Sequence, residues 1–346
     1  MRIRSLRSRR TILRRILSHE QSPDSSVATT SPFARCETVT MAEPDEYTFQ
    51  RYLEAKRTVD DRALHRPTID RLQAELASRG DGRPVRVLDV GAGTGAMLRR
   101  LLDWDVLQGA VDYTGVDARE QAVTTGRHRI EEWAAQHNWG LANEGTRADP
   151  FEIDRDGHAV RATLQQGDVF EVIATGEWEP DLIVGCAFLD VVELGEALPR
   201  LFGVGADPLV YFPITFDGET IFRPVHDRAI ESRMMDAFHA TMNEPDRPGG
   251  SRTGRRLFDA IPSYGGRLLS AGGSDWVISP EEQEYPADEA YFLHHIIDIV
   301  TGAVEEYQPA DLDPAQIRQW GQQRHTDVTN AELVYSTHQF DVLAKA

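Results

Sequence analysis

The chain has 346 residues, of which 40% are hydrophobic and 27% are charged, values that are ordinary for a globular protein. This length allows either one large domain with insertions or two domains. No apolar run approaches the roughly 18 residues that a membrane-spanning helix requires, so we expect no membrane span.

The net charge is strongly acidic and unevenly distributed. It is formally −19, with 56 acidic against 37 basic residues, and only two of the basic residues are Lys. Residues 1–40 carry eight Arg and three acids, so the rest of the chain has a net charge of −24. A Lys-poor acidic body is typical of halophilic adaptation, although a GC-rich genome also favours Arg over Lys. The charge argues against nucleic acid as a partner, because binding phosphates needs a basic surface.

The N-terminal stretch at 1–40 is interpreted as a disordered basic leader or an over-extended gene start. It contains a twin Arg, but no uninterrupted apolar stretch follows, so an export signal is not predicted. Cys36 and Cys186 form neither a disulfide framework nor a zinc-binding spacing. We therefore expect a cytoplasmic protein.

The predicted elements begin with helix and continue as alternating strands and helices. Residues 47–78 have helical spacing, and Pro67 is predicted to split this helix because proline has no N–H to donate. Strands are predicted, in chain order, at 85–90, 113–117, 160–165, 181–186 and 209–214. Helices are predicted from about residue 95, at 119–136 and at 193–201. This alternation predicts a parallel sheet covered on both faces.

The last third of the chain is less regular. Helices are predicted at 228–241, 252–261, 288–306 and 314–324. A strand at 267–270 is predicted to continue through a Gly272-Gly273 bulge to 276–278. The chain closes with a predicted strand at 332–343.

Together these elements predict an α/β fold with a seven-stranded, doubly wound, mostly parallel sheet and a C-terminal antiparallel strand. We expect a helical N-terminal cap at 41–79 and a main domain at 80–346. Helical insertions are predicted at about 223–263 and 281–330. The cap and the insertions are expected to cover the substrate.

A glycine-rich turn, Asp89-Val-Gly91-Ala-Gly93-Thr-Gly95, lies where the first predicted strand meets a helix. Glycines let the backbone turn sharply and approach a ligand, and the helix N-terminus supplies N–H groups. The turn also satisfies the dinucleotide pattern G-x-G-x-x-G/A, so an NAD(P)- or FAD-dependent oxidoreductase is the alternative. Asp89 would repel a pyrophosphate, but it would attract the amino group and sulfonium of S-adenosylmethionine (SAM).

With this turn, a preceding helix and a closing strand, the chain resembles the class I (Rossmann-like) SAM-dependent methyltransferases over roughly residues 47–346. The resemblance implies SAM as the cofactor. The residues that it implies for cofactor binding are Asp89, Gly91, Ala92, Gly93, Gly95, Asp117, Ala118, Asp168, Val169 and Cys186.

The resemblance also implies individual roles for four of these residues. Asp117 corresponds to the acid that hydrogen-bonds both ribose hydroxyls, although NAD enzymes place an acid similarly. Asp168 would accept from the adenine amino group and Val169 would offer its backbone N–H. A helix N-cap is the alternative for Asp168. Cys186 opens the segment expected to pass the methyl group, and ordinary core packing is its alternative.

The segment after the fourth strand, Gly185-Cys-Ala-Phe-Leu-Asp190, points to the substrate class. It lacks the Asn/Asp-Pro-Pro-Tyr/Phe pattern of amino-directed enzymes and the Pro-Cys nucleophile of cytosine enzymes. Together with the acidic body, this favours a small-molecule substrate. Candidate substrate-binding residues are Tyr52, Lys56, Arg57 and Tyr211. Lys56 is either a grip for a substrate carboxylate or a solvated charge on a helix face.

No motif identifies a catalytic residue. Asp190, His294 and His295 are the candidates, since a His can act as a base near neutral pH. The usual alternative for such a His pair is one core and one surface residue. No metal site is expected, because Asp217 and Glu219 are not obvious partners for Asp190. A non-catalytic SAM-binding protein is the remaining alternative.

Overall fold

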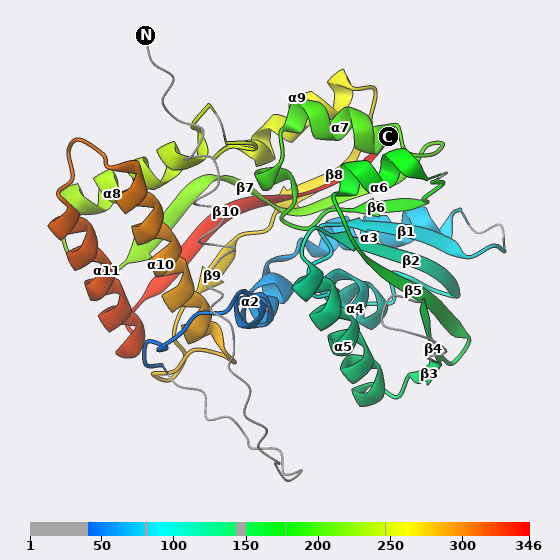
Figure 1. Ribbon diagram of the computed structural model, residues 1–346, viewed down its shortest axis with the longest axis horizontal. Helices are drawn as coiled ribbons and strands as arrows, with labels where there is room; N and C mark the ends of the chain where they lie inside the picture. Colours follow the sequence, from blue (N-terminus) through cyan, green and yellow to red (C-terminus); the bar gives the residue numbers. More distant parts are fainter. Residues whose placement is uncertain (1–40, 80–81, 143–149, 177, 246) are drawn as a thin grey trace. The chain divides into compact units, whose positions relative to one another are not determined.

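The computed structural model describes residues 41–79, 82–142, 150–176, 178–245 and 247–346. The leader interpreted at 1–40 lies outside the described residues. The chain forms two compact units, whose elements are labelled in Figure 1. Unit 1 comprises Met1–Thr58, Phe222–Thr241 and Ile278–Tyr335, and unit 2 comprises Val59–Ile221, Met242–Val277 and Ser336–Ala346.

Each unit is therefore assembled from three separate stretches of chain. The chain passes from one unit to the other after Thr58, Ile221, Thr241, Val277 and Tyr335. Every one of these positions lies inside a helix or a strand rather than in a loop. None of the described helices is both long and apolar enough to cross a membrane.

A sheet with a parallel centre forms the middle of unit 2. Its parallel strands are β1 (Val85–Val90), β2 (Ala110–Asp117), β5 (His158–Gln166), β6 (Leu182–Val184) and β7 (Leu209–Arg223). The strand order along the sheet is β3-β4-β5-β2-β1-β6-β7-β10-β8, and β9 (Trp276–Ile278) pairs with β10. Strand β10 (Val334–Lys345) runs antiparallel to β8 (Arg267–Gly273).

This order is that of a doubly wound sheet with its last strand inserted next to the edge. The first five predicted strands correspond to β1, β2, β5, β6 and β7. In the sheet they lie in the order β5-β2-β1-β6-β7, and the closing strand β10 lies between β7 and β8. The predicted α/β class, the mostly parallel sheet and the C-terminal antiparallel strand are confirmed.

The strand count predicted from the sequence was too low, because the described part of the sheet has ten strands. Strands β3 (Gly140–Ala142) and β4 (Phe151–Arg155) add an antiparallel edge beside β5, in a stretch predicted to be irregular. In β4, Phe151 and Ile153 are buried and alternate with more exposed residues, which is the period-two pattern of a half-buried strand. This alternation covers only the five residues of β4, so it is a weak signal for a strand.

Helices cover both faces of this sheet in unit 2 (Figure 1). On one side lie α4 (Ala96–Asp103) and α5 (Glu120–Gln136), and on the other α6 (Val169–Thr175), α7 (Leu194–Phe202) and α9 (Thr253–Ser263). The core under the second group includes Val90 and Ile183 from the strands and Leu198 and Leu257 from the helices.

The boundaries of the predicted insertions and cap need correction. Helix α9 was assigned to the insertion at 223–263, but Leu257 and Ile261 are fully buried in the core of unit 2. Only 222–241 of that insertion belongs to unit 1. The second insertion, predicted at 281–330, corresponds to 278–335 in unit 1. The predicted cap is divided in the same way, because α3 (Arg66–Ala77) belongs to unit 2.

The predicted split of the N-terminal helix is confirmed. Helix α2 (Phe49–Ala63) ends before α3, and Pro67 lies in the first turn of α3, where an N–H is not needed. The N–H of His65, just before α3, donates to Asp341 of β10 at 2.8 Å. Asp341 is fully buried and also accepts from Tyr211 Oη at 3.0 Å and Ile214 N at 2.9 Å, and burial raises its pKa. One carboxylate therefore joins α3, β7 and β10.

Unit 1 contains α8 (Arg228–Met242), α10 (Glu289–Tyr307) and α11 (Pro314–Thr329), together with α2 as far as Thr58. A buried Arg324 of α11, with 1% of its side chain exposed, pairs with Glu231 of α8 and with Asp327. It also donates to the carbonyl oxygen of Pro224 at 2.6 Å. Trp320 Nε1 donates to the same Glu231 at 2.9 Å. Charged and polar contacts thus fasten α8 to α11.

Candidate functional site

The predicted glycine turn is present at the carboxyl end of β1. Gly91, Gly93 and Gly95 have φ angles of +72°, +55° and +70°, a region that residues with a side chain rarely adopt. A Cβ on Gly91 would lie 2.9 Å from the Phe188 ring, and one on Gly95 would lie 2.7 Å from Ile130. Both the backbone conformation and the surrounding space therefore require glycine.

Helix α5 packs closely against this turn. A Cβ on Gly126 of α5 would lie 3.1 Å from the backbone of Thr94 and 3.2 Å from that of Gly93. The helix backbone thus comes close to the turn and holds it in place. Sequence reasoning missed Gly126, although a glycine inside a predicted helix is a signal of close packing.

Asp89, the last carboxylate before the turn, is almost completely buried, with 1% exposed. Its Oδ2 accepts a hydrogen bond from the Tyr113 hydroxyl at 2.6 Å, whereas its buried Oδ1 has no hydrogen-bond partner among the described residues. Burial raises the pKa of Asp89 to about 7, with a smaller rise from Asp117, and the Tyr113 hydrogen bond opposes both. A buried carboxylate with one bare oxygen fits a cationic ligand, because such a group is costly without compensation.

Asp117 ends β2 and is tied to the turn. Its Oδ2 accepts from Gly93 N and its Oδ1 from Arg119 N, both at 2.9 Å. A carboxylate has about four acceptor positions, so roughly two remain for a ligand diol. The next residue, Ala118, is exposed. The structure therefore orients Asp117 through the backbone of the same glycine turn.

Asp168 is the N-cap of α6, as the alternative interpretation proposed. Its Oδ1 accepts from Phe170 N at 2.8 Å and from Glu171 N at 3.3 Å. The residue is exposed, and both of these hydrogen bonds use one oxygen, which leaves Oδ2 to accept from a ligand. Val169 is the first residue of α6, where the backbone N–H has no partner within the helix. Capping and ligand binding are therefore compatible at this position.

Cys186 follows β6 and is partly exposed. Near it lies a buried charge cluster that sequence reasoning missed. Arg100 of α4, with 4% of its side chain exposed, pairs with Asp60 at 3.2 Å and with Asp61 at 2.5 Å. Trp276 Nε1 donates to Asp60 at 3.0 Å. Burial would lower the pKa of Arg100, but Asp60, Asp61 and, more weakly, Cys186 raise it.

This cluster places a buried guanidinium, paired with two carboxylates, near Cys186 of the segment predicted to pass the methyl group. The only sequence signal was a pair of Arg residues at 99–100, in a helix that follows a glycine turn and is otherwise apolar. Its partners lie about 40 positions away in α2, where no pattern predicts the pairing.

Three other predicted residues of unit 2 have structural contacts. Tyr211 is fully buried, and its hydroxyl donates to Asp341. Asp190 accepts from Phe216 N at 3.0 Å and so joins the segment that follows β6 to strand β7. Asp217 pairs with Arg255 at 2.8 Å.

The remaining candidates lie in unit 1. Lys56 is buried, with a relative exposure of 7%, so its interpretation as a solvated charge was wrong. Tyr52 stacks on Phe292, with ring centroids 5.5 Å apart, and lies 4.6 Å from the His295 ring. His294 is fully buried and His295 partly so, and burial lowers the pKa of both. Arg57 is partly exposed.

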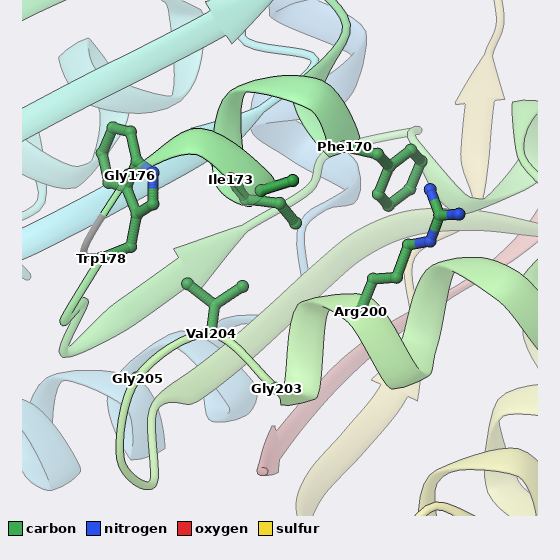
Figure 2. Close-up of a pocket in the computed structure, with 9 residues that line it drawn as sticks. Phe170, Ile173, Gly176, Trp178, Arg200, Gly203, Val204 and Gly205 are labelled. Atoms are coloured by element: carbon green, nitrogen blue, oxygen red, sulfur yellow. The ribbon is translucent and has the colours of Figure 1, made fainter.

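A separate cavity of about 470 Å³ lies between α6 and α7 (Figure 2). Phe170, Ile173, Trp178 and Val204 give it apolar walls. The Arg200 guanidinium lies 5.3 Å from the centre of the Phe170 ring. Figure 2 shows these two side chains next to each other. None of the predicted cofactor residues lines this cavity, so it is distinct from the glycine turn.

No model of a known protein family matches the chain. No curated protein matches it in sequence. Among solved structures, it is similar to a SAM-dependent methyltransferase from Thiobacillus denitrificans in complex with S-adenosyl-L-homocysteine. That likeness has 13% identity, 82% coverage of this chain, 92% of the other and a TM-score of 0.39.

Two further solved structures are similar to the chain. One is the magnesium protoporphyrin IX methyltransferase from Synechocystis PCC 6803, with 11% identity, coverages of 96% and 92% and a TM-score of 0.38. The other is a SAM-dependent methyltransferase from Geobacter sulfurreducens, with 14% identity, coverages of 82% and 92% and a TM-score of 0.37. At such identities, the residues of the site must decide the function.

Proposed function

We propose that the protein is a SAM-dependent methyltransferase. The observation that carries this proposal is the buried Asp89 at the glycine turn, whose Oδ1 has no hydrogen-bond partner in the described chain. A nicotinamide or flavin dinucleotide would bring pyrophosphate negative charge to this turn, and Asp89 opposes it. The amino group and sulfonium of SAM are positive, and Asp89 attracts them.

The other candidate cofactor residues, at the end of β2 and the start of α6, fit the remaining parts of SAM. Asp117, already oriented by Gly93 N and Arg119 N, has acceptor positions for the ribose hydroxyls. Asp168 would accept from the adenine amino group while it caps α6, and the N–H of Val169 would donate to the ring. The glycine backbone at Gly91 and Gly93 permits the close approach that this binding needs.

When bound, SAM supplies a methyl group activated by its sulfonium, so the S–CH₃ bond breaks as the bond to the acceptor forms. The protein has to align the acceptor with that bond and exclude water. Cys186 lies in the segment from which we propose that the acceptor approaches, and Arg100 of α4 is close enough to interact with it. A base is needed only where the acceptor arrives protonated, and Asp190, His294 and His295 are our candidates for that role.

We propose a small molecule as the acceptor. The net charge of −24 outside residues 1–40 disfavours nucleic acid, and the segment 185–190 has no amine-holding motif. Tyr52, Lys56 and Arg57 are proposed to contact this substrate. Lys56 is buried and is one of only two Lys in the chain, and a retained Lys in an Arg-rich chain suggests a role that its compact ammonium fills.

The cofactor is tested by thermal unfolding of the full chain with SAM, S-adenosylhomocysteine, NADH or FAD. At about 100 times its Kd, the true ligand stabilises the fold by roughly 2.7 kcal/mol. We expect SAM and S-adenosylhomocysteine to raise the Tm and the other two to leave it unchanged. A rise with NADH or FAD alone would replace our proposal with an oxidoreductase.

Catalysis is tested separately from binding. The wild-type chain and Asp117→Ala are incubated with SAM that is isotopically labelled at the methyl group and with pooled small-molecule amines, acids and phenols. We expect label transfer by the wild type and at least tenfold less by Asp117→Ala, with equal far-UV circular dichroism. Binding of SAM without transfer to any pool would indicate the non-catalytic alternative.

A further inference from the structure

We infer that unit 1 contains a binding site for one divalent transition-metal cation, formed by His325 Nε2 and the carboxylates of Asp298 and Glu43. No metal-ligand spacing is visible in the sequence, because the three residues come from the segment before α2, from α10 and from α11. The fold brings one ligand atom of each to within 4.8 Å of the others. This inference is independent of methyl transfer.

The distances suit a shared cation. His325 Nε2 lies 3.2 Å from Asp298 Oδ1 and 3.9 Å from Glu43 Oε1. Ligands of a tetrahedral zinc ion, each about 2.1 Å from the metal, lie about 3.4 Å from one another. The observed spacings bracket this value, so a cation fits between the three atoms with small side-chain adjustments.

A chain of hydrogen bonds fixes which nitrogen of His325 faces the carboxylates as an acceptor. His294 Nε2 lies 3.0 Å from the carbonyl oxygen of Met41, which can only accept, so the proton of His294 is on Nε2. His294 Nδ1 then has a lone pair, and it lies 2.8 Å from His325 Nδ1. In the neutral pair, His325 must therefore carry its own proton on Nδ1.

In the neutral pair, His325 Nε2 therefore carries no proton, and it faces the carboxylates of Asp298 and Glu43. Three acceptors facing one another repel unless something positive lies between them. A metal cation resolves the repulsion, and the His294–His325 hydrogen bond is the outer contact that orients a ligating imidazole. The competing resolution is a second proton on His325, and the experiment below separates the two.

The ligand set indicates the class of metal. One imidazole and two carboxylates suit Zn²⁺ and its neighbours better than a soft cation such as Cu⁺. The exposed fractions are 11% for the His325 side chain, 44% for Asp298 and 54% for Glu43, so water can complete the coordination. Bound metal would tie the segment before α2 to α10 and α11.

Zinc binding by the full chain, stripped of metal with a chelator and then dialysed, is measured by calorimetry. We expect one Zn²⁺ per chain and a rise in Tm of about 5 °C at saturating metal. His325→Gln should weaken binding by about 100-fold, and Glu43→Gln by about tenfold. Glu43 is half exposed, so its replacement should leave the fold intact, which circular dichroism checks.

His338→Gln is the matched control. His338 also has two carboxylate neighbours, but Asp275 lies at its Nδ1, 2.7 Å away, and Asp217 at its Nε2, 3.8 Å away. Those carboxylates flank opposite sides of the ring and cannot share one cation with it, so this variant should bind Zn²⁺ like the wild type. Equal affinity of the wild type and His325→Gln would overturn the inference.

Discussion

The two units hold their functional side chains in different ways. In unit 2, the cofactor candidates from Asp89 to Gly95 are neighbours in sequence, and backbone geometry at the end of β1 positions them. In unit 1, side chains are held by partners far away along the chain: Arg51 pairs with Asp288 across 237 positions, and His294 bonds to Met41 across 253. The first arrangement can be recognised in a sequence, whereas the second appears only once the chain has folded.

This contrast predicts where single substitutions cost most. In unit 1 a substitution should mainly lower the free energy of unfolding, because removing one partner leaves another buried charge without it. In unit 2 we expect the cost to fall on ligand binding, because we propose that the glycine turn binds the cofactor.

The largest effect is expected for Arg324→Met in unit 1. Its side chain is 1% exposed, and the change would remove the guanidinium that pairs with the buried carboxylates of Glu231 and Asp327. Breaking such a buried pair costs roughly 3–5 kcal/mol. Urea unfolding measures the loss. The control is Arg318→Met on the same helix, since Arg318 is 60% exposed and 3.8 Å from Glu305, and it should cost less than about 1 kcal/mol. Equal losses in the two variants would remove the contrast.

The next largest effect is expected for Gly91→Ala in unit 2. The new side chain meets Phe188 at 2.9 Å while φ is +72°, so we expect a cost of about 2 kcal/mol or more and loss of SAM binding. Gly109→Ala is the control, because Gly109 has φ +71° but open space around its Cβ position. It should show the backbone strain alone and bind SAM normally. If both variants bind SAM equally well, the turn is not the cofactor site.

A third prediction uses the pKa of Asp89, which burial raises to about 7. The carboxylate becomes charged as the pH rises through 7, so SAM should bind more tightly, by at most tenfold per pH unit below that value. The stability of the ligand-free protein should change in the opposite direction. The proton that burial stabilises is fully bound below the ordinary pKa of 3.8, and its contribution is lost as the pH rises through 7.

Asp89→Asn should remove both trends, leaving SAM affinity weak and independent of this ionisation. Titration calorimetry between pH 6 and pH 8 checks the binding, and urea unfolding over a wider range checks the stability. Tyr113→Phe offers a refinement, since it deletes the hydrogen bond that lowers the pKa of Asp89. The midpoint of the binding trend should move to higher pH, and a midpoint that stays unchanged would contradict this role of Tyr113.

The smallest effect is expected at Asp168. Asp168→Ala removes the N-cap of α6 and should cost about 1 kcal/mol of stability, together with part of the SAM affinity. Asp168→Ser preserves the cap and should restore the stability but not the affinity. If the serine variant also binds SAM like the wild type, Asp168 acts as a cap alone.

Several elements could be predicted from sequence because their signals are local. The glycine turn, the apolar strands on either side of it and the proline that starts α3 each depend on neighbouring residues. The closing strand β10 was also predictable from its alternation, although the face that carries Thr337, Gln339 and Asp341 is buried despite being polar. Polarity alone would place that face in solvent, but Asp341 is buried because backbone N–H groups and a tyrosine hydroxyl satisfy it.

The rest could not be predicted, because it depends on distant partners. Nothing near Arg100 indicates that Asp60 and Asp61 will bury it. Likewise, in the proposed metal site Asp298 and His325 are 27 positions apart, Glu43 is more than 250 positions from both, and the three residues share no motif. The helix at 252–261 was predicted from sequence, but not the unit whose core would receive the corresponding α9.

The five passages of the chain between the units, each inside a helix or a strand, have a consequence for genetics and engineering. Neither unit corresponds to a single contiguous stretch of the gene, so neither can be expressed by truncation or exchanged with another protein as a cassette. A frameshift or stop just before β10 removes residues 336–346 from unit 2, even though the other two stretches of that unit have by then been translated. Newly synthesised chain therefore cannot complete unit 2 until residues 336–346 have left the ribosome.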